Sequence, residues 1–344
     1  MVINSDNGHL DRIRVTALTS GWRVPSSRFR VRQFIAPLKR LGVEVLERRL
    51  PFSKYALRRT GPLSAFARLP AVAAARFSDV TWLERELVAG RRSLEHFAGS
   101  RRLFDIDDAL WLLGRSKFSE RIAAESFGTV AGNEFIAEYY RQYCSRVWVV
   151  PTSVDTSAWK PPVKRQSGPW TIGWIGTSSN LPHLLTLEGP IAAFLKRHDD
   201  AQLLVVCDKR PGFSSIPERS RRFVRWSPNN EIGLVQSMDV GLMPLPDTEW
   251  ARGKCALKML LYMAVGIPVI TSRIGVAASL VSGSDIGITT NSQDDWYDAL
   301  QLLFDSSSVG RSMGMAGRRL AEEKYSVLGN SQKLAEIFRE AAAA

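Results

Sequence analysis

The chain has 344 residues, of which 45% are hydrophobic, and a formal net charge of +12. This length allows two domains of ordinary size, and the composition supplies enough apolar side chains for a core in each. Charged residues interrupt the long apolar runs before they reach the ~18 residues of a membrane span, and the N-terminus lacks a signal pattern. We therefore expect a globular, cytoplasmic protein.

Cysteines and histidines are few and scattered along the chain. Cys144, Cys207 and Cys255 are widely spaced and odd in number, which argues against a disulfide framework and for a reducing compartment. The four histidines form no close pair, so we expect no zinc site.

The positive charge is concentrated in the first half of the chain. Residues 1–150 carry 25 Lys and Arg against 15 Asp and Glu, whereas residues 151–344 carry 21 against 19. Residues 48–76 contain seven basic residues and no acidic one. Arg58, Arg59 and Arg68 alternate there with Phe52, Tyr55 and Phe66. This composition is typical of a segment at an anionic membrane surface, and also of an ordinary exposed helix pair.

The first half of the chain predicts a βαβ opening followed by further strands. Residues 13–18 alternate and then become apolar, residues 28–41 have helical periodicity up to Gly42, and residues 43–46 form a second strand. Such a unit implies a parallel sheet covered by helices. Further strands are expected over residues 80–83, 102–105, 129–131 and 147–150.

The same pattern starts again in the second half. Residues 160–169 indicate a linker, and residues 170–175 predict a new first strand. Later strands are expected over residues 203–206, 223–226, 240–243, 269–270 and 286–288. We therefore expect an α/β protein with two Rossmann-like domains, residues 1–155 and 156–326, facing each other across a cleft.

The most informative stretch covers residues 252–271. It predicts a helix that opens at Gly253 and closes at Gly266, with Pro268 just beyond and a buried strand over residues 269–271. Lys254 and Lys258 are four residues apart and would share one face of the first turns.

The start of this predicted helix is a candidate diphosphate site. A helix N-terminus offers unpaired backbone N–H groups and a positive dipole end, and two lysines beside it add charge. The predicted binding residues are Gly253, Lys254, Cys255, Ala256 and Lys258.

This stretch resembles the donor-binding segment of retaining glycosyltransferases of the GT-B fold, glycosyltransferase family 4. The family pattern there is Lys-x-x-Glu-Ala-Met-Ala-x-Gly-x-Pro-Val-(Val/Ile). The residues that match it are Lys258, Met263, Ala264, Gly266, Pro268, Val269 and Ile270. The family often has two glutamates separated by seven residues at this helix start, and Gly253 and Leu261 stand in their places.

Further segments between about residues 100 and 320 resemble the family in the same order. Residues 173–180 are similar to the strand and glycine loop near the donor phosphates. There Gly176 would let the backbone approach a phosphate and Thr177 would donate a hydrogen bond. Residues 239–246 are similar to the strand and loop before the diphosphate helix, and residues 151–155 to the family's Pro-Asn-Gly-Val-Asp.

The resemblance implies a hexosyltransferase-type enzyme. It would move a sugar from a nucleotide-diphosphate sugar to an acceptor hydroxyl, with retention, and would need no cofactor and no metal. The acceptor would be a carbohydrate or a lipid-linked molecule of cell-surface polysaccharide or glycolipid synthesis, reached at the inner face of the membrane. Residues 1–155 would be the acceptor side and residues 156–326 the nucleotide-sugar side. A final helix over residues 327–344 would cross back to the first domain.

Candidate catalytic carboxylates follow the predicted strand over residues 102–105. In the family this strand end often carries His-Asp, and Asp107 and Asp108 stand in that place, where they would orient acceptor or sugar hydroxyls. Asp105 and Asp107 also resemble the Asp-x-Asp of haloacid-dehalogenase phosphatases and of the other large glycosyltransferase fold. The mid-chain position, Ala109 and the second Rossmann-like half argue against both. Capping of the following helix is the alternative for Asp108.

Arg28 and Arg30 follow the first predicted loop. In such enzymes the first domain meets the donor diphosphate or the acceptor there. Each arginine is equally compatible with an exposed position on an amphipathic helix.

Three other functions stay open. A non-catalytic nucleotide-sugar or glycan-binding protein is suggested by the missing glutamates. A sugar-nucleotide epimerase would need histidines and carboxylates in the cleft, where the four histidines are not suggestively placed. For nucleic-acid binding no basic-aromatic recognition module is visible.

Overall fold

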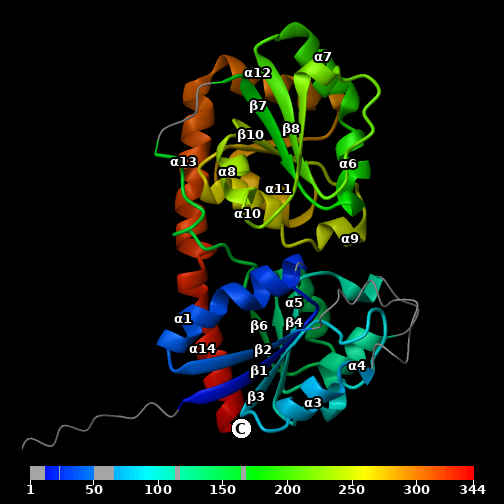
Figure 1. The fold of residues 1–344 in the computed structure, drawn as a ribbon, viewed down its shortest axis with the longest axis vertical. Coiled ribbons are helices and arrows are strands. Elements are labelled where there is room, and N and C mark those ends of the chain that lie inside the picture. Colours follow the sequence, from blue (N-terminus) through cyan, green and yellow to red (C-terminus); the bar gives the residue numbers. More distant parts are fainter. Residues whose placement is uncertain (1–11, 23, 50–65, 113–116, 164–167) are drawn as a thin grey trace, which may run out of the picture. The chain divides into compact units, whose positions relative to one another are not determined.

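The structure, a computed structural model, describes residues 12–22, 24–49, 66–112, 117–163 and 168–344. Contacts divide the chain into two compact units (Figure 1). The first unit consists of Met1–Thr152 with Val327–Ala344, and the second of Ser153–Ser326. Each unit has its own apolar core.

The first unit is built on a six-stranded parallel sheet of order β2-β1-β3-β4-β5-β6. Its strands are β1 (Ile13–Thr19), β2 (Val43–Arg49), β3 (Val80–Glu84), β4 (Arg102–Ile106), β5 (Gly128–Ala131) and β6 (Val147–Val149). Every residue of β3 and β4 is buried. This is typical of central strands in a parallel sheet with helices on both faces.

The segment predicted to be helical over residues 28–41 is helical in the structure up to Arg40, but it is not one regular α-helix. The segment consists of a π-helical turn η1 (Ser27–Val31), a 3₁₀ turn η2 (Arg32–Phe34) and α1 (Ile35–Arg40). Pro37 explains the break, because it has no N–H for the carbonyl of Gln33 and its ring crowds that carbonyl. The Gln33 side chain donates to the carbonyl of Phe29 at 2.7 Å.

The last helix, α14 (Val327–Ala343), packs on the sheet of the first unit (Figure 1). It contacts β1, β3 and α1. Phe338 is fully buried, and its ring meets Trp82 edge-on with 5.1 Å between centroids. The end of the chain thus completes the core of the first unit. Among the described residues of this unit, the other α-helices are α3 (Leu69–Ala75), α4 (Phe118–Ala124) and α5 (Glu134–Tyr140).

The second unit contains another six-stranded parallel sheet, of order β12-β11-β10-β7-β8-β9. Its strands are β7 (Trp170–Ile175), β8 (Ala201–Cys207), β9 (Arg221–Arg225), β10 (Val240–Met243), β11 (Val269–Ser272) and β12 (Gly287–Thr290). Its helices are α6 (Leu181–Leu185), α7 (Glu188–Arg197), α8 (Glu231–Gln236), α9 (Glu249–Arg252), α10 (Leu257–Ala264), α11 (Gly275–Ser282), α12 (Gln293–Asp305) and α13 (Ser307–Lys324). The expected α/β fold with two Rossmann-like units is confirmed.

The basic segment of residues 48–76 is only partly described. Phe52, Tyr55, Arg58 and Arg59 lie outside the described residues, whereas Phe66 is 65% exposed. In the ranges that the structure describes, no helix is both long and apolar enough to pass through a membrane.

Arg68 corrects one expectation about this segment, because it is not a surface residue. Its side chain is 1% exposed and donates to the carbonyl of Thr19 at 2.8 Å. Burial lowers the pKa of Arg68 to about 10, against the opposing charges of Glu84, Glu95 and Glu86. Arg68 therefore cannot touch a membrane surface.

Candidate functional site

The strand order of the second unit brings two loops to one crevice. β7 pairs with β8 on one side and with β10 on the other. In an open parallel sheet, ligands bind at such a switch point, outside the carboxyl ends of the strands. The loop after β7 holds Gly176 and Thr177, and the loop after β10 leads to Lys254 and α10.

Gly176 and Lys258 come together at this edge of the sheet. A Cβ atom on Gly176 would lie 2.7 Å from the Trp174 indole and 2.8 Å from Cε of Lys258. Nζ of Lys258 lies 5.6 Å from the centroid of the Trp174 ring. Only glycine leaves room for this arrangement, so the predicted glycine loop and one predicted lysine form one site.

Lys254 belongs to the same site. Partial burial lowers the pKa of His183, and the positive charges of Lys254 and Lys258 lower it further. Lys254 precedes the first residue of α10 by three positions, and Lys258 is the second residue of that helix. Nζ of Lys254 also lies 5.6 Å from the centroid of the Trp250 ring. We call Lys254 and Lys258 the lysine cluster.

The helix that was expected to open at Gly253 begins four residues later, at Leu257. Gly253 instead ends the short helix α9, whose first turn is capped by the Thr248 side chain accepting from the N–H of Ala251 at 3.2 Å. Ala256 precedes α10 in the left-handed region, with φ 52° and ψ 30°. The N-cap residue Ala256 has no side chain that can cap α10, and the positive end of the helix dipole lies beside Lys258.

Cys255 and Thr177 are the remaining predicted binding residues of the second unit. Burial, and to a smaller extent Cys255, raises the pKa of Tyr325. The exposed Thr177 hydroxyl shares hydrogen bonds of 2.9 Å with Ser179 and Asn180.

Asp208, at the end of β8, holds the glycine loop in place. Its carboxylate accepts from the backbone N–H of Ser178 at 2.7 Å and from the Ser178 hydroxyl at 2.8 Å. Partial burial alone would raise the pKa of Asp208, but these hydrogen bonds lower it below the ordinary value. The charged carboxylate therefore organises the loop that meets Lys258.

Tyr262 is a residue of this site that sequence reasoning missed. Its ring fills the space over Gly241, where a Cβ atom would lie 2.3 Å from it. The hydroxyl accepts from the N–H of Ile175 at 3.2 Å and donates to the carbonyl of Leu242 at 3.3 Å. Tyr262 thereby joins α10 to β7 and β10 at the switch point. The signal in the sequence is a polar phenol within an otherwise apolar helix.

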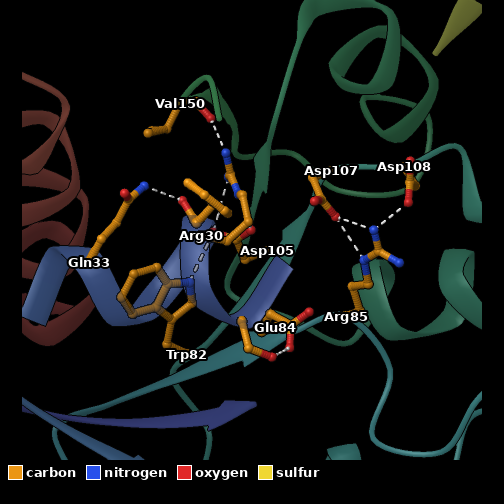
Figure 2. A network of polar contacts seen from close by, with 11 residues as sticks. Arg30, Gln33, Trp82, Glu84, Arg85, Asp105, Asp107, Asp108 and Val150 are labelled. Atoms are coloured by element: carbon orange, nitrogen blue, oxygen red, sulfur yellow. Dashed lines mark hydrogen bonds and ion pairs between the residues drawn. The ribbon is translucent and has the colours of Figure 1, made fainter. Parts of the chain in front are cut away.

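In the first unit, Arg85 holds both predicted catalytic carboxylates (Figure 2). Its Nε donates to Asp107 at 2.7 Å, and its terminal nitrogen pairs with Asp107 and with Asp108. Arg85 has φ 59°, a conformation that costs free energy in a non-glycine residue and is characteristic of functional sites. Although burial opposes the effect, Arg85 and Arg30 lower the pKa of Asp107. Asp107 is therefore favoured as an ionised hydrogen-bond acceptor, and Arg85 positions Asp108 beside it.

Asp105 and Arg30 form a buried structural pair (Figure 2). Arg30 donates to the two carboxylate oxygens at 2.8 and 3.1 Å, and Trp82 Nε1 donates to one of them at 3.0 Å. Arg30 also donates to the carbonyl of Val150 at 2.6 Å. The expectation that Arg30 meets a ligand or lies exposed is wrong, because it is 2% exposed. The enclosed Asp105 also argues against a phosphatase nucleophile.

Arg28 lies beside this pair in the chain but is only half-buried, in η1, with its guanidinium 5.1 Å from the Phe29 centroid. The neighbouring Ser27 donates to Glu84 at 2.8 Å, and the N–H of Ser20 donates to the same carboxylate oxygen at 2.8 Å. Glu84 ends β3, at the switch point of this sheet between β1 and β3. It is a second site residue that the sequence reasoning missed.

Among the side chains that the structure describes, no group of three or more His, Cys, Asp or Glu residues is placed to hold a metal ion.

A family model described as "Glycosyl transferases group 1" matches residues 171–306, within the second unit. Two D-inositol 3-phosphate glycosyltransferases are similar in sequence. That of Corynebacterium urealyticum is 26% identical over 235 residues, which are 59% of this chain and 53% of the relative. That of Corynebacterium aurimucosum is 24% identical over 233 residues, which are 60% of this chain and 54% of the relative. The chain thus spans about half the length of these relatives.

Solved structures share the fold over nearly the whole chain. HepE of Anabaena, in complex with UDP and glucose, has a TM-score of 0.69 at 13% identity, covering 95% of this chain and 99% of its own. Sucrose-phosphate synthase of Thermosynechococcus elongatus has a TM-score of 0.70 at 14% identity, covering 96% and 100%. The predicted resemblance to GT-B glycosyltransferases is confirmed, and at these identities the structures speak for the fold alone.

Proposed function

We propose that the chain is a glycosyltransferase that moves a sugar from a nucleotide-diphosphate sugar to an acceptor hydroxyl, with retention and without a metal ion. The observation that carries this proposal is the close approach of Lys258 to Gly176 at the start of α10, with Lys254 three residues before that helix. Helix N–H groups and ammonium groups are what a diphosphate binds. The similar glycosyltransferases, and the HepE structures with UDP and UDP-glucose, support the proposal.

The proposed transfer makes one bond and breaks one. The acceptor oxygen bonds to the anomeric carbon while the bond from that carbon to the diphosphate breaks. The bond's electron pair leaves with the diphosphate, and the acceptor's proton passes to a diphosphate oxygen. Stabilising the charge on the leaving group is the main catalytic demand. The lysine cluster and α10 supply fixed positive charge where other transferases use a metal ion.

The first unit supplies the acceptor side of the proposal. Asp107 and Asp108, both paired with Arg85, accept hydrogen bonds from hydroxyls of the acceptor or the sugar. Arg28, in η1, adds a further cation of this unit for an anionic ligand. A carbohydrate or a lipid-linked acceptor offers the hydroxyls that these carboxylates require.

Nucleoside-diphosphate affinity tests the site. We expect Lys258→Ala and Lys254→Ala each to lose about 1.5–3 kcal/mol of binding, because each removes a charge-assisted contact. Titration calorimetry with uridine, guanosine and thymidine diphosphates measures this loss. Lys196→Ala, an exposed lysine of α7, is the matched control. Unchanged affinity in both site variants would refute the assignment.

Turnover in excess chelator tests metal independence. We expect the rate to be undiminished, because the positive charge at the leaving group belongs to the chain. Activity that is abolished by chelator and restored by manganese or magnesium would instead point to Asp107 and Asp108 as metal ligands, because Asp105 is enclosed by Arg30 and Trp82.

A non-catalytic nucleotide-sugar-binding protein is the second candidate. It is favoured by Gly253 and Leu261, which supply no carboxylate where the resembling family often has two; Leu261 is 4% exposed. An assay for transfer and for hydrolysis of nucleotide sugars separates the two candidates. Binding without either reaction would support the second.

A further inference from the structure

The positive charge of the second unit is confined to one segment at the outer edge of its sheet. Residues 209–225 carry six basic residues against one acidic residue, a net charge of +5. The rest of the unit, within residues 153–326, carries 13 Lys and Arg against 16 Asp and Glu, a net charge of −3. We call the six basic residues of this segment the basic edge: Lys209, Arg210, Arg219, Arg221, Arg222 and Arg225.

Most cations of the basic edge are available to a partner. Five of the six residues are exposed, and Arg221 is half-buried. Arg210 and Arg221 both pair with the carboxylate of Glu218, at 3.7 and 2.7 Å. None of the other four forms an ion pair within the part of the chain that the structure describes. Glu218 thus shows the kind of group that these side chains bind, and four cations are left for another molecule.

The basic edge lies along an outer strand. β9 pairs with β8 and has no second neighbour among the described strands. An outer strand presents main-chain N–H and C=O groups to which a further strand can add. Charged side chains often protect such an edge, most often as lysines. Protection alone does not explain six cations of which five are arginines, whose planar forks suit carboxylates.

The basic edge offers no apolar side chain for insertion into a membrane. Phe213 is 7% exposed, with the Arg221 guanidinium 5.9 Å from its centroid, and the half-buried Phe223 has Arg210 at 5.7 Å. Among the described residues 168–301, no large apolar side chain is exposed. A recess of about 20 Å³ between these rings and arginines has room for about one small polar group. The surface therefore suits carboxylates on an extended chain better than it suits a bilayer.

We propose that the basic edge docks an extended acidic segment of a partner protein, which adds along β9 as a strand. The carboxylates of the segment pair with the exposed arginines, and its main chain pairs with the free side of β9. This interaction does not depend on the proposed transfer reaction, because the basic edge shares no residue with the proposed diphosphate site.

Fluorescence anisotropy with a labelled Glu-Val-Glu-Thr-Glu-Val-Glu-Thr peptide and the full chain tests the proposal. We expect this peptide to bind more tightly than its Gln-for-Glu counterpart, and added salt to weaken it. Arg219→Gln, Arg222→Gln and Arg225→Gln together should weaken binding about tenfold, because three exposed pairs are lost. Lys196→Gln, Arg197→Gln and Arg319→Gln, exposed outside the basic edge, remove the same charge and should change affinity by less than about twofold.

Two further measurements separate strand addition from charge alone. Glu218→Gln should strengthen peptide binding about threefold, because it frees Arg210 and Arg221 for the peptide. A peptide with proline in place of Val and Thr keeps the charge but lacks N–H groups for the ladder, so it should bind about fivefold more weakly.

Three results would overturn the proposal: equal binding of the acidic and the neutral peptide, unchanged binding by the triple variant, or equal binding of the proline peptide. Anionic vesicles and a single-stranded oligonucleotide are the competing probes. Binding to either one that is lost in the triple variant, without binding of the acidic peptide, would assign the basic edge to that partner instead.

Discussion

Gly176 shows how much of the proposed diphosphate site depends on one missing side chain. The Trp174 indole and the Lys258 stem occupy the space that a Cβ atom would need. The loop, the aromatic ring and the ammonium group are therefore held together by a close approach that no other residue permits.

Gly176→Ala should damage the site while leaving the fold intact. We expect about 1–3 kcal/mol of overpacking, relieved partly by displacement of Lys258, and weaker nucleoside-diphosphate binding in consequence. Calorimetry and urea unfolding measure the two effects. Gly189→Ala is the control, because a Cβ atom there meets nothing within 4 Å. Unchanged binding by Gly176→Ala would contradict the role of the close approach.

The pKa of His183 reports on the lysine cluster. It lies below the ordinary value of 6.5, so the unfolded chain binds the proton more readily than the folded one. Stability from this group is therefore complete above pH 6.5 and declines as the pH falls toward the folded pKa. Lys258→Ala should raise the pKa of His183, because it removes one repelling charge. NMR titration of the ring, assigned with His183→Asn, measures this. A pKa that stays the same in Lys258→Ala would show that the two groups are not neighbours.

At the scale of secondary-structure elements, α14 belongs to the first unit although it follows the second in sequence. Its buried side chains join the core formed by β1, β3 and α1. Arg339 adds a hydrogen bond of 2.7 Å to the carbonyl of Leu41, at the end of α1.

Phe338→Ala should destabilise the first unit. The ring is fully buried against Trp82, so we expect a loss of about 3–5 kcal/mol in the free energy of unfolding. Urea unfolding followed by tryptophan fluorescence measures the loss. Leu328→Ala, in the same helix but 66% exposed, should change stability by less than about 0.5 kcal/mol. Equal effects of the two variants would argue against packing of α14 on the sheet.

At the scale of the whole molecule, the basic excess of residues 1–150 is the dominant charge asymmetry. Burial of Arg68 removes one contributor to a membrane surface. Arg48 and Arg49 at the end of β2 remain exposed, as do Phe66 and Phe77, at 65% and 81%. We therefore still propose a peripheral contact with an anionic membrane, made by these exposed residues.

Co-sedimentation with anionic and neutral vesicles tests that contact. Each basic residue near such a surface contributes about 1 kcal/mol, so Arg48→Gln with Arg49→Gln should weaken binding to anionic vesicles, and added salt should weaken it further. Arg197→Gln with Arg219→Gln, exposed in the second unit, is the control. Binding that survives high salt would point to Phe66 and Phe77 instead. Equal, negligible binding to both vesicle types would leave the charge as a solvated face.

The sequence by itself determined the strands and the repeated βα pattern. Buried parallel strands are short apolar runs between turn residues, so segments such as residues 170–175 and 240–243 are legible without the fold. The end of α10 could also be predicted from the sequence, because glycine favours the left-handed conformation that follows a helix and Pro268 cannot continue one. In the structure Gly266 has φ 74°. These features depend on neighbours in the chain.

Only the tertiary structure decided which cations are buried, which face a ligand, and where α10 begins. Arg30 and Arg68 lie within the same basic half as Arg48, yet their partners, Asp105 and the Thr19 carbonyl, are 75 and 49 residues away. Lys258 joins Gly176, and Tyr262 joins Ile175, across similar separations. A long cationic side chain is buried only where distant segments supply oxygen atoms for its donors, and a pattern of adjacent residues carries no information about those segments.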